Sequence, residues 1–527
     1  MSDPLQTVRQ AFDLDDATFK AIVLGFRSEY ESGLKTASAS GLATMIPSYV
    51  TTLPTGKETG TYLALDLGGS TLRVSAVELS GSNRVNVTEV RRQIAPNDPM
   101  RTTDSVTFFD WIADAVVELL QKIGRGNSHN EDTLSLGVCW SFPVDQISIS
   151  SGKILRMGKG FTIDGVQGQD FSTLFNEAFS RKGVNVKVAA LINDTVGTLV
   201  AHAYTNPKTR VGFIYGTGVN AAYPEKTSAM VKLNGSSHTC SEDTEMLVNT
   251  EIDIFGSDAY LPLNKYDREL DANHSQPEFQ LYEKMMSGAC IGELVRLACL
   301  DLIKEEHLFN GHRPEEFSTA MEFGTAITSD VEGRINDTIE LRFDHFKELF
   351  HFEDAYQVEL QDLKAFTEVC QFVSNRAARL AGAAIASLIE QQTGVLDGTD
   401  DIVIGVNGST YEKYPKMHER ICESLSSWFT PETYKRIHVE LATDGGSIGG
   451  ALIAMLAEKD ERINRDIQKK PTKPKTLPKQ VASSNQPPPP PSLLGCLFAW
   501  LPSRGHRSKK EETLVDESIH VHEEPKL

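Results

Sequence analysis

The sequence lacks three features that would place it in other classes of protein. It has no apolar run of transmembrane length, and its start, Met1-Ser2-Asp3-Pro4, shows neither the basic nor the apolar region of a secretory signal. Its seven cysteines are scattered, odd in number and without CxxC spacing, which disfavours a disulfide framework or a zinc site. We therefore expect a soluble cytoplasmic protein with reduced thiols.

Positive charge is also scarce. The 527 residues include 52 Lys and Arg against 72 Asp and Glu, a formal net charge of -20. A nucleic acid or an anionic membrane needs a basic footprint, so neither is expected as the main partner. Nucleotides remain compatible, because glycine-rich loops and one or two cations can hold them. With 40% hydrophobic and 24% charged residues, the chain has the composition of a globular protein of two or three domains.

One short segment predicts a phosphate site. Asp66-Leu67-Gly68-Gly69-Ser70-Thr71, with Arg73 after it, follows the apolar run 62–65, which is typical of a buried strand. The glycines would let backbone N–H groups approach phosphate oxygens, the hydroxyls would donate, and Asp66 could face Mg²⁺ through water. An ordinary tight hairpin is the alternative, since Gly-Gly often marks a turn.

The pattern along the chain predicts an α/β protein with two related halves. Helices should come first, followed by loops near Pro47 and Pro54, and glycine-ended apolar strands recur near 66, 216 and 408. An antiparallel meander opens the first half. The expected strands are 63–65, 72–79, 85–94, 134–139, 184–192, 211–215 and 403–404, and the expected helices are 108–123, 170–182, 196–204 and 374–393.

The composition changes after about residue 459. Lysines and prolines accumulate, with five consecutive prolines at 487–491, and such a segment cannot bury enough apolar surface to order itself. One apolar island, 493–501, is followed by basic residues at 504–510. The stretch 487–510 is compatible with a peripheral membrane anchor acylated at Cys496, with a protein-docking peptide, or with an idle tail.

A candidate catalytic acid follows an apolar strand. Ala190-Leu191-Ile192 leads into Asn193-Asp194-Thr195 directly before the helix at 196–204. Asp194 could simply cap that helix, or it could be a general base that takes a proton from a substrate hydroxyl.

A set of hydrogen-bonding residues near predicted strand ends and loops suits a sugar. Sugar hydroxyls both donate and accept, and carboxylates bind pairs of them well. Taken singly, each of these residues could equally be a solvated surface residue. The set is Ser141-Phe142-Pro143, Lys159, Asn220, Glu251 and Glu283.

The order of these segments resembles the hexokinase family over nearly all of residues 60 to 457. The matching blocks are LALDLGGSTLRV, SFP with GKILRMGKGF, LINDTVGTLV, GFIYGTGVNAAY, VNTEIDIFG, YEKMMSGACIGELVRL, IGVNGSTYEKYP and TDGGSIGGALIA. The resemblance implies a two-lobed actin-like ATPase fold, a duplicated ribonuclease-H-like α/β architecture with the ligand cleft between the lobes. The implied parts are an N-terminal helical segment 1–59 packed on the large lobe, a small lobe 60–193 to which 447–459 returns, a large lobe 194–446, and a disordered tail 460–527.

The resemblance also implies roles for individual residues, with ATP and Mg²⁺ as cofactors. Asp194 would be the general base. The sugar site would be lined by Ser141, Phe142, Pro143, Lys159, Asn193, Asn220, Glu251 and Glu283. ATP would be bound by Asp66, Gly68, Gly69, Ser70, Thr71, Arg73, Gly216, Thr217 and Gly218, with Gly408, Ser409, Asp444 and Gly445 beside the nucleoside.

Departures from the usual pattern bear on the sugar. Glucose-type members typically read W-T-K-G-F and N-x-E-W-G, whereas this chain has Gly158 and Ile252 where the Thr and the Trp stand. The lost bulk and hydroxyl predict a pocket that accepts a 2-acetamido group and binds glucose less well. The chain looks most like the divergent fungal N-acetylglucosamine kinases, so we expect phosphorylation of the 6-hydroxyl of N-acetylglucosamine. A glucose or fructose hexokinase and a catalytically weak sugar sensor are the alternatives.

Overall fold

The computed structural model describes residues 4–36, 44–125, 132–233, 244–353 and 356–469. All of them lie in one unit that spans 1–470, and 471–527 form a second unit outside the described residues. The docking predicted for 487–510 therefore falls outside the described residues and stays a prediction. Among the helices that are described, none is both long and apolar enough to cross a membrane.

A five-stranded sheet organises the first lobe. Its order is β10-β6-β2-β3-β4, with β2, β3 and β4 antiparallel and β2, β6 and β10 parallel. The antiparallel meander expected from the sequence is confirmed. The strands are β2 (Thr59–Leu67), β3 (Thr71–Ser80), β4 (Val85–Gln93), β6 (Leu134–Trp140) and β10 (Val186–Ile192), and shorter pairs are β5 (Thr102–Asp104) with β9 (Thr162–Asp164) and β7 (Val144–Gln146) with β8 (Gly152–Ile154).

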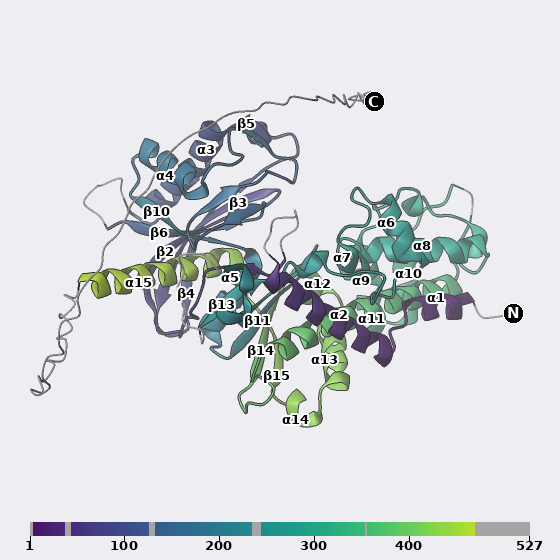
Figure 1. Ribbon diagram of the computed structural model, residues 1–527. Helices are drawn as coiled ribbons and strands as arrows, with labels where there is room; N and C mark the ends of the chain where they lie inside the picture. Colours follow the sequence, from purple (N-terminus) through teal and green to yellow (C-terminus); the bar gives the residue numbers. More distant parts are fainter. Residues whose placement is uncertain (1–3, 37–43, 126–131, 234–243, 354–355, 470–527) are drawn as a thin grey trace, which may run out of the picture. The chain divides into compact units, whose positions relative to one another are not determined.

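Helices cover both faces of this sheet. α3 (Ser105–Lys122) and α4 (Phe171–Lys182) bury their apolar sides in one core with the strands, and α15 (Gly450–Lys469) packs on β2, β6 and β10 from the other face (Figure 1). α15 continues ten residues beyond the point where the sequence predicted the tail. Charged residues dominate that last part, so no apolar pattern predicted a helix there. An ion pair between Glu458 and Arg462, one turn apart, stabilises the helix at this point.

A six-stranded sheet with the order β1-β13-β12-β11-β14-β15 organises the second lobe. The strands are β1 (Ile46–Pro47), β11 (Thr209–Tyr215), β12 (Val219–Lys226), β13 (Glu245–Asn249), β14 (Ile402–Asn407) and β15 (Ile437–Leu441). Its core is built around α11 (Leu360–Gln391), the alanine-rich helix expected at 374–393, which begins fourteen residues earlier than predicted. The two sheets with their helices make a two-lobed α/β fold, as expected.

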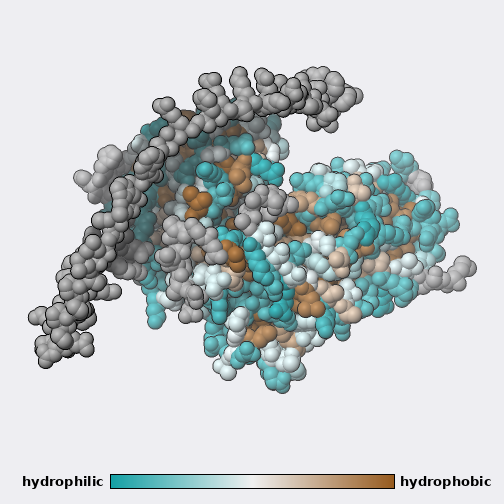
Figure 2. Space-filling model, viewed as in Figure 1, coloured by the Kyte–Doolittle hydropathy of each residue, from teal (hydrophilic) through white to brown (hydrophobic). Residues whose placement is uncertain are grey.

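The N-terminal helices pack on α11. α1 is Pro4–Phe12 and α2 is Asp16–Lys35, and the Tyr30 hydroxyl lies 2.9 Å from that of Ser387 on α11. The remaining helices are α6 (Lys265–Asn273), α7 (Leu281–Met286), α8 (Ile291–Lys304), α9 (Thr325–Gly333), α10 (Ile339–Glu348), α12 (Ser409–Lys413), α13 (Met417–Trp428) and α14 (Pro431–Tyr434). Seen from one side, the surface over these helices is mainly hydrophilic, with apolar groups scattered among polar ones (Figure 2).

Two helical segments join the sheets and cross where both carry glycine. α5 (Asp194–Thr205) follows β10 of the first sheet, and a π-helical turn at Gly445–Gly449 follows β15 of the second and leads into α15. A Cβ atom on Gly449 would lie 2.1 Å from the carbonyl oxygen of Gly197, and one on Gly197 would lie 2.3 Å from that of Gly445. The crossing therefore brings backbone against backbone, with no room for side chains.

Candidate active site

The glycine-rich segment forms the turn between β2 and β3, so the hairpin expected as the alternative is present. Within this turn the carbonyl oxygens are occupied, since that of Ser70 accepts the Ile94 N–H at 2.8 Å and that of Gly69 accepts from Arg101 at 2.6 Å. In the part of the chain that the structure describes, no protein acceptor is paired with the N–H groups of Gly69 and Ser70. A turn with occupied carbonyls and free amides is an anion-binding geometry, so the hairpin and the phosphate site are compatible.

The hydroxyl of Thr71 does not point toward the predicted phosphate site. It donates to Gln93 on the neighbouring strand β4 at 3.2 Å and so is directed along the sheet rather than left free for phosphate. The alternation of side chains on β3 accounts for this, because Thr71 is already the first residue of the strand.

Acidic and basic groups from both lobes meet beside this turn. Arg73 lies 3.4 Å from Asp66 and 3.2 Å from Asp444, which follows β15 and precedes Gly445. Burial raises the pKa of Asp66 to about 6, with Arg73 opposing the shift and Asp194 adding to it. The predicted phosphate segment and the predicted nucleoside segment are thus brought together by one guanidinium.

Asp194 is the first residue of α5, and Asn193 is the residue that caps the helix. The Thr195 N–H donates to the Asn193 side chain at 2.8 Å and to the Asp194 carboxylate at 2.9 Å. Asn193 is thus the capping residue of the helix, and capping alone does not account for Asp194. Burial raises the pKa of Asp194, while the nearby positive charge of Lys159 opposes the rise.

Two glutamates at this site are held by neighbouring amides. Glu251 follows β13 in a left-handed backbone conformation with φ 52°. Its carboxylate accepts the Asn249 side-chain amide at 2.5 Å, and the Asn220 amide on β12 lies 3.5 Å away. Glu283 on α7 accepts the backbone N–H of Val219 at 2.9 Å. Burial raises the pKa of Glu251 to about 8 and that of Glu283 to about 7. Both side chains are half-buried, and the nearby negative charge of Asp253 adds to the rise of each pKa.

Lys159 stands on a strained loop beside the phosphate turn. Its φ is 54°, a conformation that favours glycine, and its ammonium group lies 5.9 Å from the ring centre of Phe142. Phe142 is buried and carries Ser141 and Pro143 on either side, directly after β6. The segment Ser141–Pro143 is therefore brought to the same edge of the first sheet as Asp66, whose strand β2 pairs with β6.

The turn Gly216-Thr217-Gly218 between β11 and β12 repeats the pattern of the first turn. The Gly216 carbonyl accepts the Gly288 N–H at 2.9 Å and the Thr410 hydroxyl at 2.8 Å, while the Thr217 carbonyl accepts the Ala289 N–H at 3.1 Å. No protein acceptor is paired with the Thr217 and Gly218 amides within the described ranges. Gly408 and Ser409 pack against this turn, and a Cβ on Gly408 would lie 2.4 Å from the Tyr215 carbonyl oxygen.

Sequence reasoning missed several residues of this site. Asp253 is buried two positions after Glu251 and accepts from Gln280 at 2.7 Å, and Arg101 holds two of the loops described above. Asp253 could have been noticed, because an acid stands there in place of the Gly of N-x-E-W-G. Arg101 gave no signal, because its partners are backbone carbonyls, which leave no trace in the sequence.

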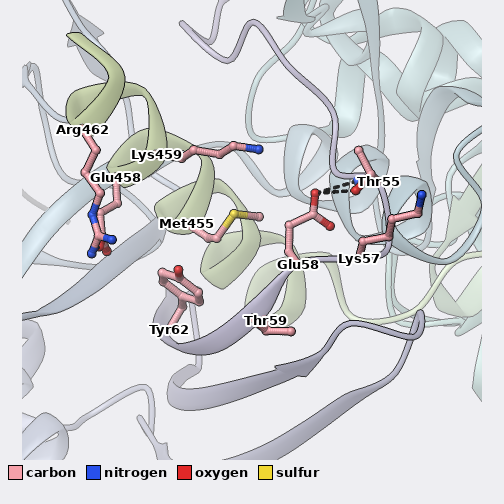
Figure 3. A pocket seen from close by; sticks show the side chains of 9 residues that line it. All are labelled: Thr55, Lys57, Glu58, Thr59, Tyr62, Met455, Glu458, Lys459 and Arg462. Atoms are coloured by element: carbon pink, nitrogen blue, oxygen red, sulfur yellow. Dashed lines mark hydrogen bonds and ion pairs between the residues drawn. The ribbon is translucent and has the colours of Figure 1, made fainter. Parts of the chain in front are cut away.

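A cavity of about 360 Å³ lies elsewhere, between the 55–62 segment and α15 (Figure 3). Charged side chains surround it, and Glu58 there accepts from both the N–H and the hydroxyl of Thr55. The predicted site residues do not line it. The residues that do are Thr55, Lys57, Glu58, Thr59, Tyr62, Met455, Glu458, Lys459 and Arg462.

Comparison with known proteins identifies the family. Two models described as hexokinase match residues 4–204 and 210–456. Hexokinase-1 of Schizosaccharomyces pombe is 31% identical over 469 residues, which cover 89% of this chain and 93% of the relative. The chain belongs to the hexokinase family. It is a hexokinase-type sugar kinase with the two-lobed hexokinase fold.

Other relatives carry related names. The glucokinase of Aspergillus niger is 33% identical over 87% of this chain and 98% of its own length, and hexokinase-2 of Candida albicans is 34% identical over 88% and 94%. A solved hexokinase of Schistosoma mansoni in complex with glucose is 31% identical, with a TM-score of 0.72, covering 86% of this chain and 99% of the other.

Proposed function

We propose that this hexokinase-family protein transfers the γ-phosphoryl group of ATP to the 6-hydroxyl of a glucose-type hexose. The names of its relatives and the glucose in the Schistosoma complex favour such a hexose over N-acetylglucosamine. The observation that carries the proposal is the position of Asp194, which begins α5 half-buried and within the electrostatic influence of Lys159, together with two turns whose amides are free. Phosphoryl transfer needs little more than such positioning and charge stabilisation.

In this proposal Asp194 accepts the proton of the attacking hydroxyl. Its raised pKa brings the carboxylate closer to the operating pH, where a general base works best. Glu251 and Glu283 accept hydrogen bonds from other sugar hydroxyls, and their orientation is already fixed by the Asn249 side chain and by the Val219 amide. Lys159 and Arg73 offset the negative charge of the phosphoryl group.

The nucleotide would be held mainly by backbone groups. The free amides of Gly69, Ser70, Thr217 and Gly218 are donors for phosphate oxygens, and Gly408-Ser409 with Asp444-Gly445 would lie by the nucleoside. Among the described residues no cluster of three or more acidic, His or Cys side chains could hold a metal ion alone. Asp66, which shares the Arg73 guanidinium with Asp444, would face Mg²⁺ that arrives on the phosphates, and the ion would neutralise phosphate charge.

The test is ADP release by the purified protein with Mg-ATP and glucose, fructose, N-acetylglucosamine or no sugar. Turnover of a hexose supports the proposal. Asp194→Asn should then lower kcat by about 10²- to 10⁴-fold while sugar binding persists. Asp114→Asn, a half-exposed acid on α3 that pairs with Lys182, is the matched control and should leave kcat unchanged. A wild-type protein that binds sugar but never releases ADP would favour the sugar sensor.

N-acetylglucosamine remains a second candidate substrate because of Gly158. A Cβ added there would meet only Phe142, at 4.0 Å, so there is open space at this point of the site. Ile252 does not contribute to the enlargement expected from the sequence, because its side chain is fully buried in the core of the second lobe. Gly158→Thr should therefore lower kcat/KM for N-acetylglucosamine and leave that for glucose equal or higher. Equal effects on both sugars would show that Gly158 does not select between them.

A cytoplasmic location is part of the same proposal. Five cysteines of the described residues are free thiols, four of them buried, which suits a reducing compartment. Subcellular fractionation with an intact C-terminal segment tests it, and recovery in a membrane fraction would instead support docking through 487–510.

A further inference from the structure

Arg101 is a buried cation that makes its hydrogen bonds to backbone carbonyls. It is 8% exposed and is the last residue of a short 3-10 turn at 99–101 in the first lobe. Its guanidinium lies 4.6 Å from the ring centre of Phe161 and donates to four carbonyl oxygens. These belong to Gly69 at 2.6 Å, Lys159 at 2.7 Å, Ala95 at 2.7 Å and Ile94 at 3.1 Å.

Two of these carbonyls belong to the loops that form the candidate site. A peptide unit is planar and trans, so its C=O and the following N–H point in opposite directions. Holding the Gly69 carbonyl toward Arg101 therefore turns the Ser70 N–H, one of the free amides, to the other side. Holding the Lys159 carbonyl in the same way supports Lys159 in its unfavourable backbone conformation, with φ 54°.

The loops also touch at their side chains. A Cβ on Gly69 would lie 3.3 Å from the Cδ of Lys159, so the aliphatic part of that lysine already rests on the phosphate turn. Phe161, on which Arg101 stacks, packs edge-to-face on Phe142 of the Ser141–Pro143 segment. One guanidinium thus joins the turn predicted for phosphate to the loops predicted for sugar.

We infer that Arg101 is a positioning residue that fixes the relative placement of the phosphate-binding amides and the Lys159 loop for phosphoryl transfer. The inference rests on the proposed function of these loops. A guanidinium is required because only its planar fork can donate in several fixed directions at once, whereas an ammonium on a flexible stem cannot reproduce them. Misplacement of reacting groups by about 1 Å can lower a rate about 100-fold.

Arg436 offers a matched control within the same chain. Its guanidinium also donates to three backbone carbonyls, those of Val395, Leu396 and Asp400, at 2.7 to 3.0 Å. It stands directly before β15, whereas Asp444 and Gly445 follow the other end of that strand. Arg436→Lys therefore removes a similar set of bonds away from the candidate site.

The experiment compares Arg101→Lys, Arg101→Ala and Arg436→Lys with the wild type. Arg101→Lys should lower kcat about 100-fold with a folded protein, as judged by circular dichroism and Tm, and Arg436→Lys should keep kcat within about twofold. Millimolar guanidinium chloride should restore kcat of Arg101→Ala by about tenfold or more, while the same concentration of potassium chloride should not. A role in stability alone would not respond to added guanidinium.

Two results would overturn the inference. One is kcat of Arg101→Lys within about threefold of the wild type. The other is an equal fall of kcat in Arg101→Lys and Arg436→Lys that follows their Tm. If the wild type turns over no sugar, the proposed function fails separately, and calorimetric binding of Mg-ATP then decides the matter. Binding weakened about tenfold or more in Arg101→Lys but not in Arg436→Lys supports a positioning role, and equal binding in both refutes it.

Discussion

At the scale of single residues, the candidate site concentrates carboxyl groups that burial keeps from ionising easily. The pKa of Asp66 is raised to about 6, that of Glu283 to about 7 and that of Glu251 to about 8, each mainly by burial. Hydroxyl-rich ligands and cations would satisfy these half-buried groups. The site therefore costs stability that ligand binding can return.

Glu283→Gln should stabilise the ligand-free protein above neutral pH. The pKa of Glu283 is raised from 4.5 to about 7. Its neutral form therefore contributes to the free energy of unfolding in full below pH 4.5, and this contribution is lost as the pH rises through about 7. Glutamine removes the ionisation and can still accept the Val219 N–H through its amide oxygen. Urea unfolding should show the variant equal to the wild type near pH 4 and more stable by about 1–3 kcal/mol at pH 8. Equal stability at both pH values would contradict the prediction.

The pH dependence of turnover should report on Asp194. A general base must be deprotonated, and burial raises the pKa of Asp194 above the ordinary 3.8, so kcat should begin to fall at a higher pH than an exposed aspartate would give. A plot of kcat against pH between 4 and 9 measures this. A profile with no acidic limb above pH 4 would argue against Asp194 as the base.

At the scale of elements, the crossing of α5 with the turn before α15 depends on glycine. Gly449→Ala places a methyl group 2.1 Å from the Gly197 carbonyl oxygen, so backbone must move, at a cost of about 1–3 kcal/mol. Gly324→Ala is the control, because its methyl group would meet nothing within 4 Å and its backbone needs no positive φ. Thermal unfolding should show a clearly lowered Tm for the first variant and a Tm near wild type for the second. Similar Tm values for both would mean that the crossing can relax.

The elements that could be predicted from the sequence are those with a local pattern. The meander at β2 to β4 was predictable because an apolar run leads into a Gly-Gly turn and further strand segments follow, and Asp194 because it directly follows an apolar strand. The first turns of α11 were missed although Leu363, Phe366 and Val369 are buried there at helical spacing, because the buried Asp362 among them is held by hydrogen bonds from Phe309 and Tyr356 outside the helix. Arg101 and the fully buried Ile252 were beyond reach for a similar reason, since their surroundings come from distant parts of the chain.

At the scale of the whole molecule, the net charge of -20 opposes the approach of a polyanion such as ATP. Raising the ionic strength from about 0.01 M to 0.15 M shortens the screening length from about 30 Å to about 8 Å, which weakens this repulsion. The association rate of a fluorescent ATP analogue should therefore rise with salt, while the KM for a neutral sugar stays constant. A rate that falls with salt would show that Arg73 and Lys159 dominate the encounter.

The two turns with free amides carry a consequence for how this chain can diverge. Every amino acid except proline carries a main-chain N–H, so any substitution other than proline at Ser70 or Thr217 keeps the donors that the turns offer. The contacts expected for the sugar, by contrast, come from side chains such as Glu251 and Asn220, which a single codon change can replace. Single substitutions can thus change which sugar is bound while the backbone groups that bind phosphate are kept. Among proteins built in this way, sugar specificity should therefore change faster in evolution than phosphoryl transfer itself.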